Sequence, residues 1–261
     1  MSLHVGTSGW SYKDWKGNFY PAHLPAREQL AFYARRLQAV EVDSSFYGAP
    51  MPSTLDHWAE ATPPGFRFAL KVPRDITHDR LLRDCADDLL AFLHLVAHLG
   101  PRLGPVILQL PPAFTRSRLP DLFRLLEALP LKPGVSVEFR HGSCFVAETF
   151  EELRNRAVGL VTTDQHTGLL LSGPDVVVRL LGDREQVQVF DRVVVDRDAD
   201  VAAWAERLLA LPTWVRDAYV FVNNHFSGHS PSTAAALAAR LGLQPPAAPP
   251  EEPGTQRSLF G

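Results

Sequence analysis

Eight short apolar runs recur along the chain, and stretches with helical spacing separate them. This alternation constrains the fold more than any other feature of the sequence. The runs are LHVGTS (3–8), AVEVDS (39–44), FRFALK (66–71), VILQL (106–110), VSVEFR (135–140), GLVTTD (159–164), VVVRL (176–180) and YVFVNN (219–224). Strand and helix alternating without a break is typical of one parallel α/β domain. The 261 residues are close to the ~250 typical of a (β/α)8 barrel. The sequence therefore predicts a single-domain (β/α)8 TIM-type barrel.

Most of these runs follow a period-two rule, which places alternate side chains on the same face of a strand. The polar set comprises Glu41 with Asp43, Arg67 with Lys71, Ser136 with Glu138 and Arg140, Arg179, and Asn223. The opposite faces are apolar and suit packing against helices. We expect the polar ends of the strands to line a pocket at the mouth of the barrel.

Between the runs, helical patterns cover most of the remaining chain. The predicted helices are 25–38, 53–61, 80–99, 119–129, 146–156, 199–211 and 232–241. The link after the sixth strand, HTGLLLSGP, is too short and too rich in Gly and Pro for a full helix. Residues 243–255 are rich in proline and are predicted to form an extended, mobile tail. The expected domain therefore spans residues 1–242, and the tail spans 243–261.

The bulk composition excludes several classes of protein. A net charge of -3 argues against a nonspecific nucleic-acid coat, although a local basic groove remains open. Two cysteines, Cys85 and Cys144, lack any motif spacing and indicate a reducing compartment. No apolar run approaches the ~18 residues of a membrane span, and the first strand begins at once, without a signal-peptide pattern. We expect a cytoplasmic protein.

Four carboxylates end predicted strands and are the candidate catalytic groups. Glu41 and Asp43 end the second strand, Glu138 ends the fifth and Asp164 the sixth. Carboxylates that meet at one mouth can serve as general acid, base or nucleophile, because neighbouring charges separate their pKa values. Structural ion pairing with barrel cations is the alternative for Glu41, Asp43 and Glu138.

Three cations, Lys71, Arg140 and Arg179, come from separate strands. Over one pocket they suit a phosphate or carboxylate, for which arginine offers two parallel donors. His78 follows Lys71 in the segment KVPRDITH and is a candidate base or a hydrogen-bonding loop residue.

Amides and aromatic rings complete the predicted substrate site. Gln109, Asn223 and Asn224 end strands, and amides both donate to and accept from hydroxyl groups and base edges. Trp10 and Tyr47 lie on the first two loops. Their rings suit stacking on sugars or bases, or packing of the loops against the rim.

No metal or nucleotide motif is present in the sequence. It contains no HExxH, CxxC, GxxxxGK or GxGxxG pattern, and its ten histidines are scattered. No metal ligand is therefore assigned and no cofactor is required. A carboxylate site for Mg²⁺ or Mn²⁺ on Glu41, Asp43 or Glu138 remains open.

Together these segments resemble the YecE-like family, known as domain of unknown function 72. The resemblance rests on GTSGW at 6–10, EVDSSFY at 41–47, FRF at 66–68 with KVPRDITH at 71–78, QLPP at 109–112, EFR at 138–140 and FVNNH at 221–225. It covers nearly the whole chain to about residue 242 and implies a TIM-type barrel without an established reaction. The chain departs from the family pattern at Asp43, where Asn is usual, and at Leu181, where a histidine is usual. A mechanism that needs that imidazole is therefore in doubt for this chain.

The C-terminal residues form a separate motif. Gln256, Leu259 and Phe260 in the sequence QRSLF resemble the short peptide by which bacterial replication and repair proteins dock on the sliding clamp. Arg257 departs from that pattern. A glutamine and an apolar pair on a mobile linker suit a hydrophobic pocket, which predicts the sliding clamp as a partner. A C-terminus folded back on the barrel is the alternative.

The sequence thus favours an enzyme, a hydrolase or isomerase, that acts on an anionic, hydroxyl-bearing substrate. The substrate classes are a phosphorylated sugar, a nucleotide or a nucleic-acid fragment, and the tail points to DNA metabolism. The competing hypothesis is a non-catalytic binding or scaffold module that is recruited through its C-terminal peptide.

Overall fold

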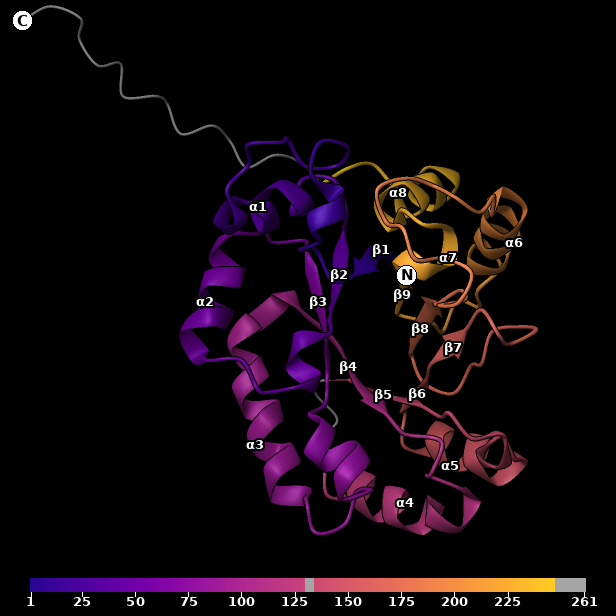
Figure 1. Cartoon of the computed structure of the whole chain (residues 1–261). Helices are drawn as coiled ribbons and strands as arrows, with labels where there is room; N and C mark the ends of the chain where they lie inside the picture. The colour runs from indigo at the N-terminus through magenta and orange to yellow at the C-terminus, as the bar shows by residue number, and fades with distance from the viewer. Residues whose placement is uncertain (130–133, 247–261) are drawn as a thin grey trace, which may run out of the picture.

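The computed structural model describes residues 1–129 and 134–246, and it contains a nearly closed barrel of nine parallel strands (Figure 1). The strands are β1 (Ser2–Ser8), β2 (Ala39–Val42), β3 (Arg67–Lys71), β4 (Leu103–Gln109), β5 (Val135–Glu138), β6 (Gly159–Leu160), β7 (Thr162–Thr163), β8 (Asp175–Leu180) and β9 (Asp217–Val222). Their order in the sheet is β6-β5-β4-β3-β2-β1-β9-β8-β7. All strands are parallel, so their carboxyl ends meet at one mouth, as in a TIM barrel.

The barrel has nine strands rather than the predicted eight because the sixth predicted strand is divided at Val161. β6 pairs with β5, whereas β7 pairs with β8. Val161 lies between them and donates its backbone N–H to the carbonyl of Val137 at 2.8 Å. This short interrupted segment brings the two edges of the sheet together.

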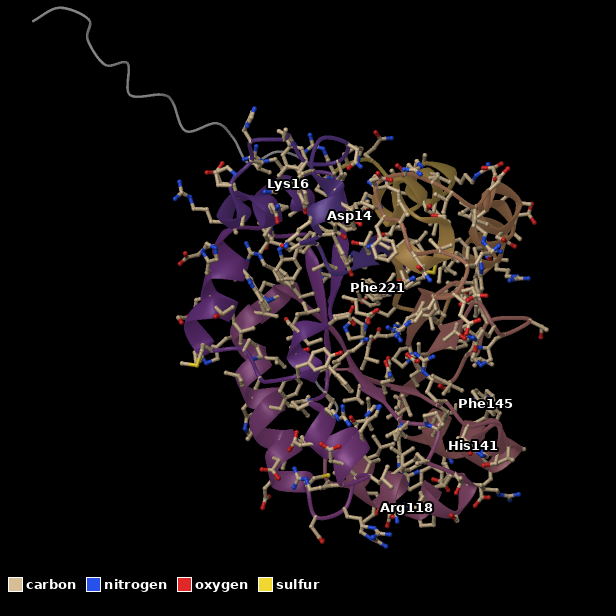
Figure 2. All side chains as sticks on the ribbon, viewed as in Figure 1. Asp14, Lys16, Arg118, His141, Phe145 and Phe221 are labelled. Atoms are coloured by element: carbon tan, nitrogen blue, oxygen red, sulfur yellow. The ribbon has the colours of Figure 1, made fainter. Side chains whose placement is uncertain are left out.

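Two separate apolar clusters confirm the predicted alternation of faces. The inner cluster contains Ala39, Ala69, Ile107, Val161, Val177, Tyr219 and Phe221, all from strands or the β6–β7 link. The outer cluster contains the alternate strand residues, such as Val40 and Val42, together with residues of the surrounding helices. Figure 2 shows side chains filling the space that the strands enclose, with Phe221 among them. The barrel is therefore a packed core, and the polar strand ends lie on top of it.

Helices surround the strands (Figure 1). They are α1 (Gln29–Ala34), α2 (Pro52–Glu60), α3 (Ala86–Val96), α4 (Leu119–Glu127), α5 (Ala147–Asn155), α6 (Asp198–Leu209), α7 (Asn224–Ser227) and α8 (Ser230–Arg240). Residues 164–174, between β7 and β8, contain no helix, as the Gly- and Pro-rich link predicts.

The predicted helix over 80–99 is wrong in its first turns. A π-helical turn occupies Asp75–Asp79, and α3 begins only at Ala86. Between them Leu81, Leu82 and Asp84 have positive φ angles of 50°, 67° and 45°, which a right-handed helix does not allow. The leucine spacing is typical of a helix, but this segment forms an irregular turn. The turn buries Leu82 in the core.

Within the described residues, no helix combines the length and the apolar character needed to cross a membrane.

Candidate functional site

A cavity of about 1020 Å³ opens at the carboxyl ends of the strands; we call it the mouth pocket. Side chains from or just after β2, β3, β4, β5, β8 and β9 line it. Among the predicted site residues, those that reach it are Asp43, Tyr47, Lys71, His78, Gln109, Arg140, Arg179 and Asn223. Strand register explains this convergence: Gln109 pairs with Glu138, and Arg179 pairs with Phe221.

Arg179 forms the charged floor of the mouth pocket. Its Nε and Nη2 donate to the two oxygens of Glu41 at 2.9 and 2.7 Å. Its Nη1 donates to Glu138 Oε2 at 2.7 Å and to Gln109 Oε1 at 3.3 Å. The side chain is only 3% exposed. Such a bidentate, charge-assisted arrangement fixes the guanidinium rigidly.

Lys71 bridges the two carboxylates of the EVD segment. Its Nζ lies 2.8 Å from Glu41 Oε1 and also contacts Asp43 Oδ1. Ser8 adds a hydrogen bond to Glu41 Oε2 at 3.3 Å. Glu41 is therefore saturated by protein donors, whereas Asp43 remains 38% exposed at the pocket wall. Of these two carboxylates, Asp43 is the one that a ligand can reach.

Glu138 is held between two arginines. Arg179 bonds its Oε2, and Arg140 Nε lies 2.6 Å from its Oε1. The geometry of the Arg140 contact does not make a hydrogen bond, so this buried oxygen is paired only by charge. Arg140 is 29% exposed and lines the pocket. Its terminal Nη groups have no hydrogen-bond acceptor among the residues that the structure describes.

The network separates the proton affinities of its carboxylates. Burial alone would raise the pKa of Glu41, but the charges of Arg179 and Lys71 hold it well below its usual range. Burial and the adjacent charge of Glu41 raise the pKa of Asp43. Burial would lower the pKa of Arg179, yet Glu138 and Glu41 raise it. Glu41 and Arg179 thus stay charged, and Asp43 is the carboxylate of this network that takes up a proton more readily.

His78 also lines the mouth pocket. Its Nδ1 pairs with the Thr77 hydroxyl at 2.9 Å, and its ring meets the edge of Phe46 at 4.9 Å. Burial and the nearby charge of Arg74 lower the pKa of His78. The imidazole is therefore neutral at pH 7, when it can accept a proton or donate a hydrogen bond.

Five predicted site residues of the described chain do not line the mouth pocket: Glu41, Glu138, Asp164, Asn224 and Trp10. Glu41 and Glu138 are buried in the ion-pair network with Arg179. Asp164 accepts backbone N–H groups of Leu181 and Gly182 at 3.0 and 2.8 Å. It thereby holds the loop after β8.

Asn224 and Trp10 are engaged in packing. Asn224 Oδ1 accepts from Trp15 Nε1 and from the backbone and hydroxyl of Ser230. Trp10 packs edge-on against Trp58, with ring centroids 5.3 Å apart. The contacts described for Asp164, Asn224 and Trp10 are with other parts of the protein, outside the mouth pocket, and their predicted catalytic and substrate-binding roles stay predictions. Gln256, Leu259 and Phe260 lie outside the described residues, and clamp docking stays a prediction.

Several lining residues were not predicted from the sequence. They include Arg74, Gln165, Asp183, Arg184 and Glu185. All lie in connections beyond the strand ends, where period-two reasoning gives no information. The charged clusters PRD at 73–75 and GDRE at 182–185 were the available signal for Arg74 and Arg184.

The carboxylates do not form a metal site. Lys71 lies between Glu41 and Asp43, and Arg179 lies between Glu41 and Glu138. Each cation occupies the position where a shared Mg²⁺ would have to bind. Over residues 1–129 and 134–246, no three His, Cys, Asp or Glu side chains are grouped to hold a metal ion.

Comparison with known proteins identifies the same family as the sequence motifs. The model of the family described as "protein of unknown function DUF72" matches residues 4–257. The chain belongs to this family. Escherichia coli protein YecE, of the family UPF0759, is 33% identical over 156 residues, which are 60% of this chain and 55% of YecE. The match thus spans little more than half of that relative.

Solved structures of the family share the fold. A DUF72 protein from Thermotoga maritima is 28% identical, with a TM-score of 0.77 over 93% of this chain and 100% of its own. A DUF72 protein from Enterococcus faecalis is 20% identical, with a TM-score of 0.72 over 93% of this chain and 96% of its own. At this identity, the similarity to the Enterococcus faecalis protein shows a shared fold only.

Proposed function

We propose that this DUF72 protein is an enzyme, a hydrolase or isomerase, that performs acid–base chemistry on a small anionic, hydroxyl-bearing substrate. The single observation that carries the proposal is Asp43. It is a pocket-facing carboxylate with a raised pKa, held beside a fixed and fully ionised partner, Glu41. Perturbed acids in a cleft at the mouth of a barrel are typical of catalytic sites.

In this proposal the substrate's anionic group binds to Arg140 and Arg184. Both line the mouth pocket, and arginine offers two parallel donors to a phosphate or carboxylate. Gln109 and Asn223 orient hydroxyl groups, since amides both donate and accept. Asp43 moves the proton, and the Lys71 ammonium stabilises negative charge that develops on the substrate oxygen.

Arg179, Glu41 and Glu138 act as positioning residues. Their mutual hydrogen bonds leave few groups free for a ligand, but they fix Lys71 and Arg140 at the pocket wall. Preorganised charges of this kind need not rearrange during the reaction, which is their catalytic advantage.

Turnover of phosphorylated sugars and nucleotides, followed by mass spectrometry and ³¹P NMR, tests the proposal. Asp43→Asn should lower kcat by about 10²–10⁴-fold while substrate affinity changes little. The matched control is Asp217→Asn at the opposite end of the barrel, which should leave turnover unchanged. Equal turnover by wild type and Asp43→Asn would remove Asp43 from the mechanism.

A non-catalytic binding module is the second candidate, and the charge balance favours it. Lys71, Arg140 and Arg179 are each paired with Glu41, Asp43 or Glu138, which a purely structural network also requires. Ligand binding without turnover of any probe, and unaffected by Asp43→Asn, would favour this module over the enzyme.

A further inference from the structure

A second cavity, of about 550 Å³, adjoins the mouth pocket; we call it the side pocket. It lies between the loop that follows β2 and helix α3, and it shares Phe46, Tyr47 and Arg74 with the mouth pocket. The two cavities therefore meet at these three residues.

The side pocket differs from the mouth pocket in chemistry. Its lining includes the buried Ile76 and Phe92, which provide an apolar surface. Three carboxylates, Asp75, Asp79 and Asp88, also line it. A second anionic group is disfavoured there, whereas a neutral ring with N–H donors fits both the apolar and the carboxylate surface.

The carboxylates of the side pocket retain hydrogen-bonding capacity. Arg80 donates to one oxygen each of Asp75 and Asp88, at 3.0 and 2.7 Å. Arg74 donates to one oxygen of Asp79 at 3.3 Å. In the described part of the chain the second oxygen of each carboxylate receives no donor. These oxygens can accept from the amino group of a ligand.

Tyr47 stands at the border between the two cavities and is 81% exposed. Its ring and that of Phe46 form a T-shaped pair, with centroids 5.2 Å apart, and the high exposure of Tyr47 leaves ring surface available to a ligand. An exposed aromatic ring beside a cavity is suited to stacking on a planar ring, such as a nucleobase.

We propose that the ligand is a nucleoside monophosphate with an amino-bearing base. Its phosphate binds to Arg140 and Arg184 in the mouth pocket, and its base stacks on Tyr47 and enters the side pocket. This inference rests on the proposed function for the anion-binding part of the site. Adenine, guanine and cytosine carry an exocyclic amino group that donates to a carboxylate, whereas uracil offers a carbonyl oxygen in its place.

Isothermal titration calorimetry of the full chain with AMP, GMP, CMP, UMP and ribose 5-phosphate tests the inference. At least one amino-bearing nucleotide should bind about tenfold or more tightly than ribose 5-phosphate, the range expected for base stacking. CMP should bind more tightly than UMP, its matched partner without the amino group.

Variants assign the affinity to the two cavities. Tyr47→Ala should reduce nucleotide affinity about tenfold and leave ribose 5-phosphate binding unchanged, whereas Tyr47→Phe should retain it. Arg140→Ala should weaken both kinds of ligand. Trp214→Ala removes an exposed aromatic residue outside both cavities and should change neither affinity.

Two results would overturn the inference, and they are distinguishable. Equal binding of nucleotides and ribose 5-phosphate, unaffected by Tyr47→Ala, would refute the nucleotide while the proposed anion site stands. Absence of binding by every phosphorylated probe would refute both.

Discussion

The two ends of the barrel use charged residues in opposite ways. At the mouth, Lys71 and Arg179 bind Glu41, Asp43 and Glu138 inside a deep pocket. At the amino end, the ion pair of Arg216 with Asp175 is partly open to solvent, because Arg216 is 55% exposed although Asp175 is 14% exposed.

The amino end keeps its buried polar group neutral. His4 stacks on Tyr219 at 4.9 Å, and its Nε2 lies 3.9 Å from Asp217, beyond a hydrogen bond. Burial lowers the pKa of His4 to about 4. The mouth thus keeps buried groups ionised, which costs desolvation free energy. The amino end keeps the buried His4 neutral and avoids that cost. We infer that the mouth keeps its buried charges for function.

The largest difference is expected when one arginine is removed from each end. Arg179→Ala leaves Glu41 and Glu138 buried without their main partner and should lower the free energy of unfolding by about 3–5 kcal/mol. Arg216→Ala breaks a pair whose arginine is more than half exposed and should cost less, about 1 kcal/mol. Urea unfolding measures both values.

Arg179→Lys keeps the positive charge but loses the bidentate geometry, and it should fall between these two values. A loss below about 1 kcal/mol for Arg179→Ala would show that the mouth network does not differ from a surface pair.

The second prediction concerns pH and the amino end. The pKa of His4 is about 4 in the fold and ~6.5 when unfolded. Above the unfolded value His4 is neutral in both states and has no effect. As the pH falls through this window, His4 becomes protonated in the unfolded chain but stays neutral in the folded chain. His4 should therefore reduce stability by about 3 kcal/mol between pH 6.5 and 4.

His4→Gln removes this titration and serves as the comparison. The difference in unfolding free energy between wild type and variant should change across the window, because other groups titrate in both proteins. Parallel pH profiles would contradict a buried neutral His4. Glu41 adds a loss at the acid end of the window, because its pKa is lowered in the fold and the unfolded carboxyl protonates first, at ~4.3. This contribution is common to wild type and His4→Gln and cancels in their difference.

The period-two pattern was sufficient to predict much of this mouth. It assigned Glu41, Lys71 and Arg179 to the polar face at strand ends, because parity along a strand is set by backbone geometry. All three meet in the structure. The pattern did not predict which charges pair, since that depends on the register of strands far apart in sequence.

Loops and irregular turns account for the remaining differences. Arg74 and Arg184 line the mouth pocket from loops, whose conformations no periodicity encodes. The left-handed residues Leu81 and Leu82 interrupt a leucine pattern that reads as helical. Division of the sixth strand at Val161 depends on closure of the barrel, a constraint of the complete fold.

A smaller effect is expected from the loop after β8. Asp164→Ala removes the acceptor for the N–H groups of Leu181 and Gly182 and should cost about 2 kcal/mol. The same loop contributes Asp183 and Arg184 to the mouth pocket, so hydrogen exchange should rise there more than at the amino end. Unchanged exchange over residues 181–185 would contradict the supporting role of Asp164.

The smallest expected effect on stability comes from the C-terminus. Deletion of residues 251–261 should leave unfolding of the barrel unchanged and abolish binding to a purified bacterial sliding clamp, measured by surface plasmon resonance. Substitution of Leu259 and Phe260 by alanine should act like the deletion. Clamp binding retained without these residues would refute the predicted docking peptide.

The central claim is that the mouth of the barrel binds an anionic ligand. A thermal-shift titration with phosphorylated sugars and nucleotides tests it most directly, because a ligand that binds only the folded chain raises Tm. We predict a rise that is lost in Arg140→Ala and kept in Arg216→Ala at the amino end. An equal rise in both variants, or none in the wild type with any phosphorylated ligand, would contradict the account.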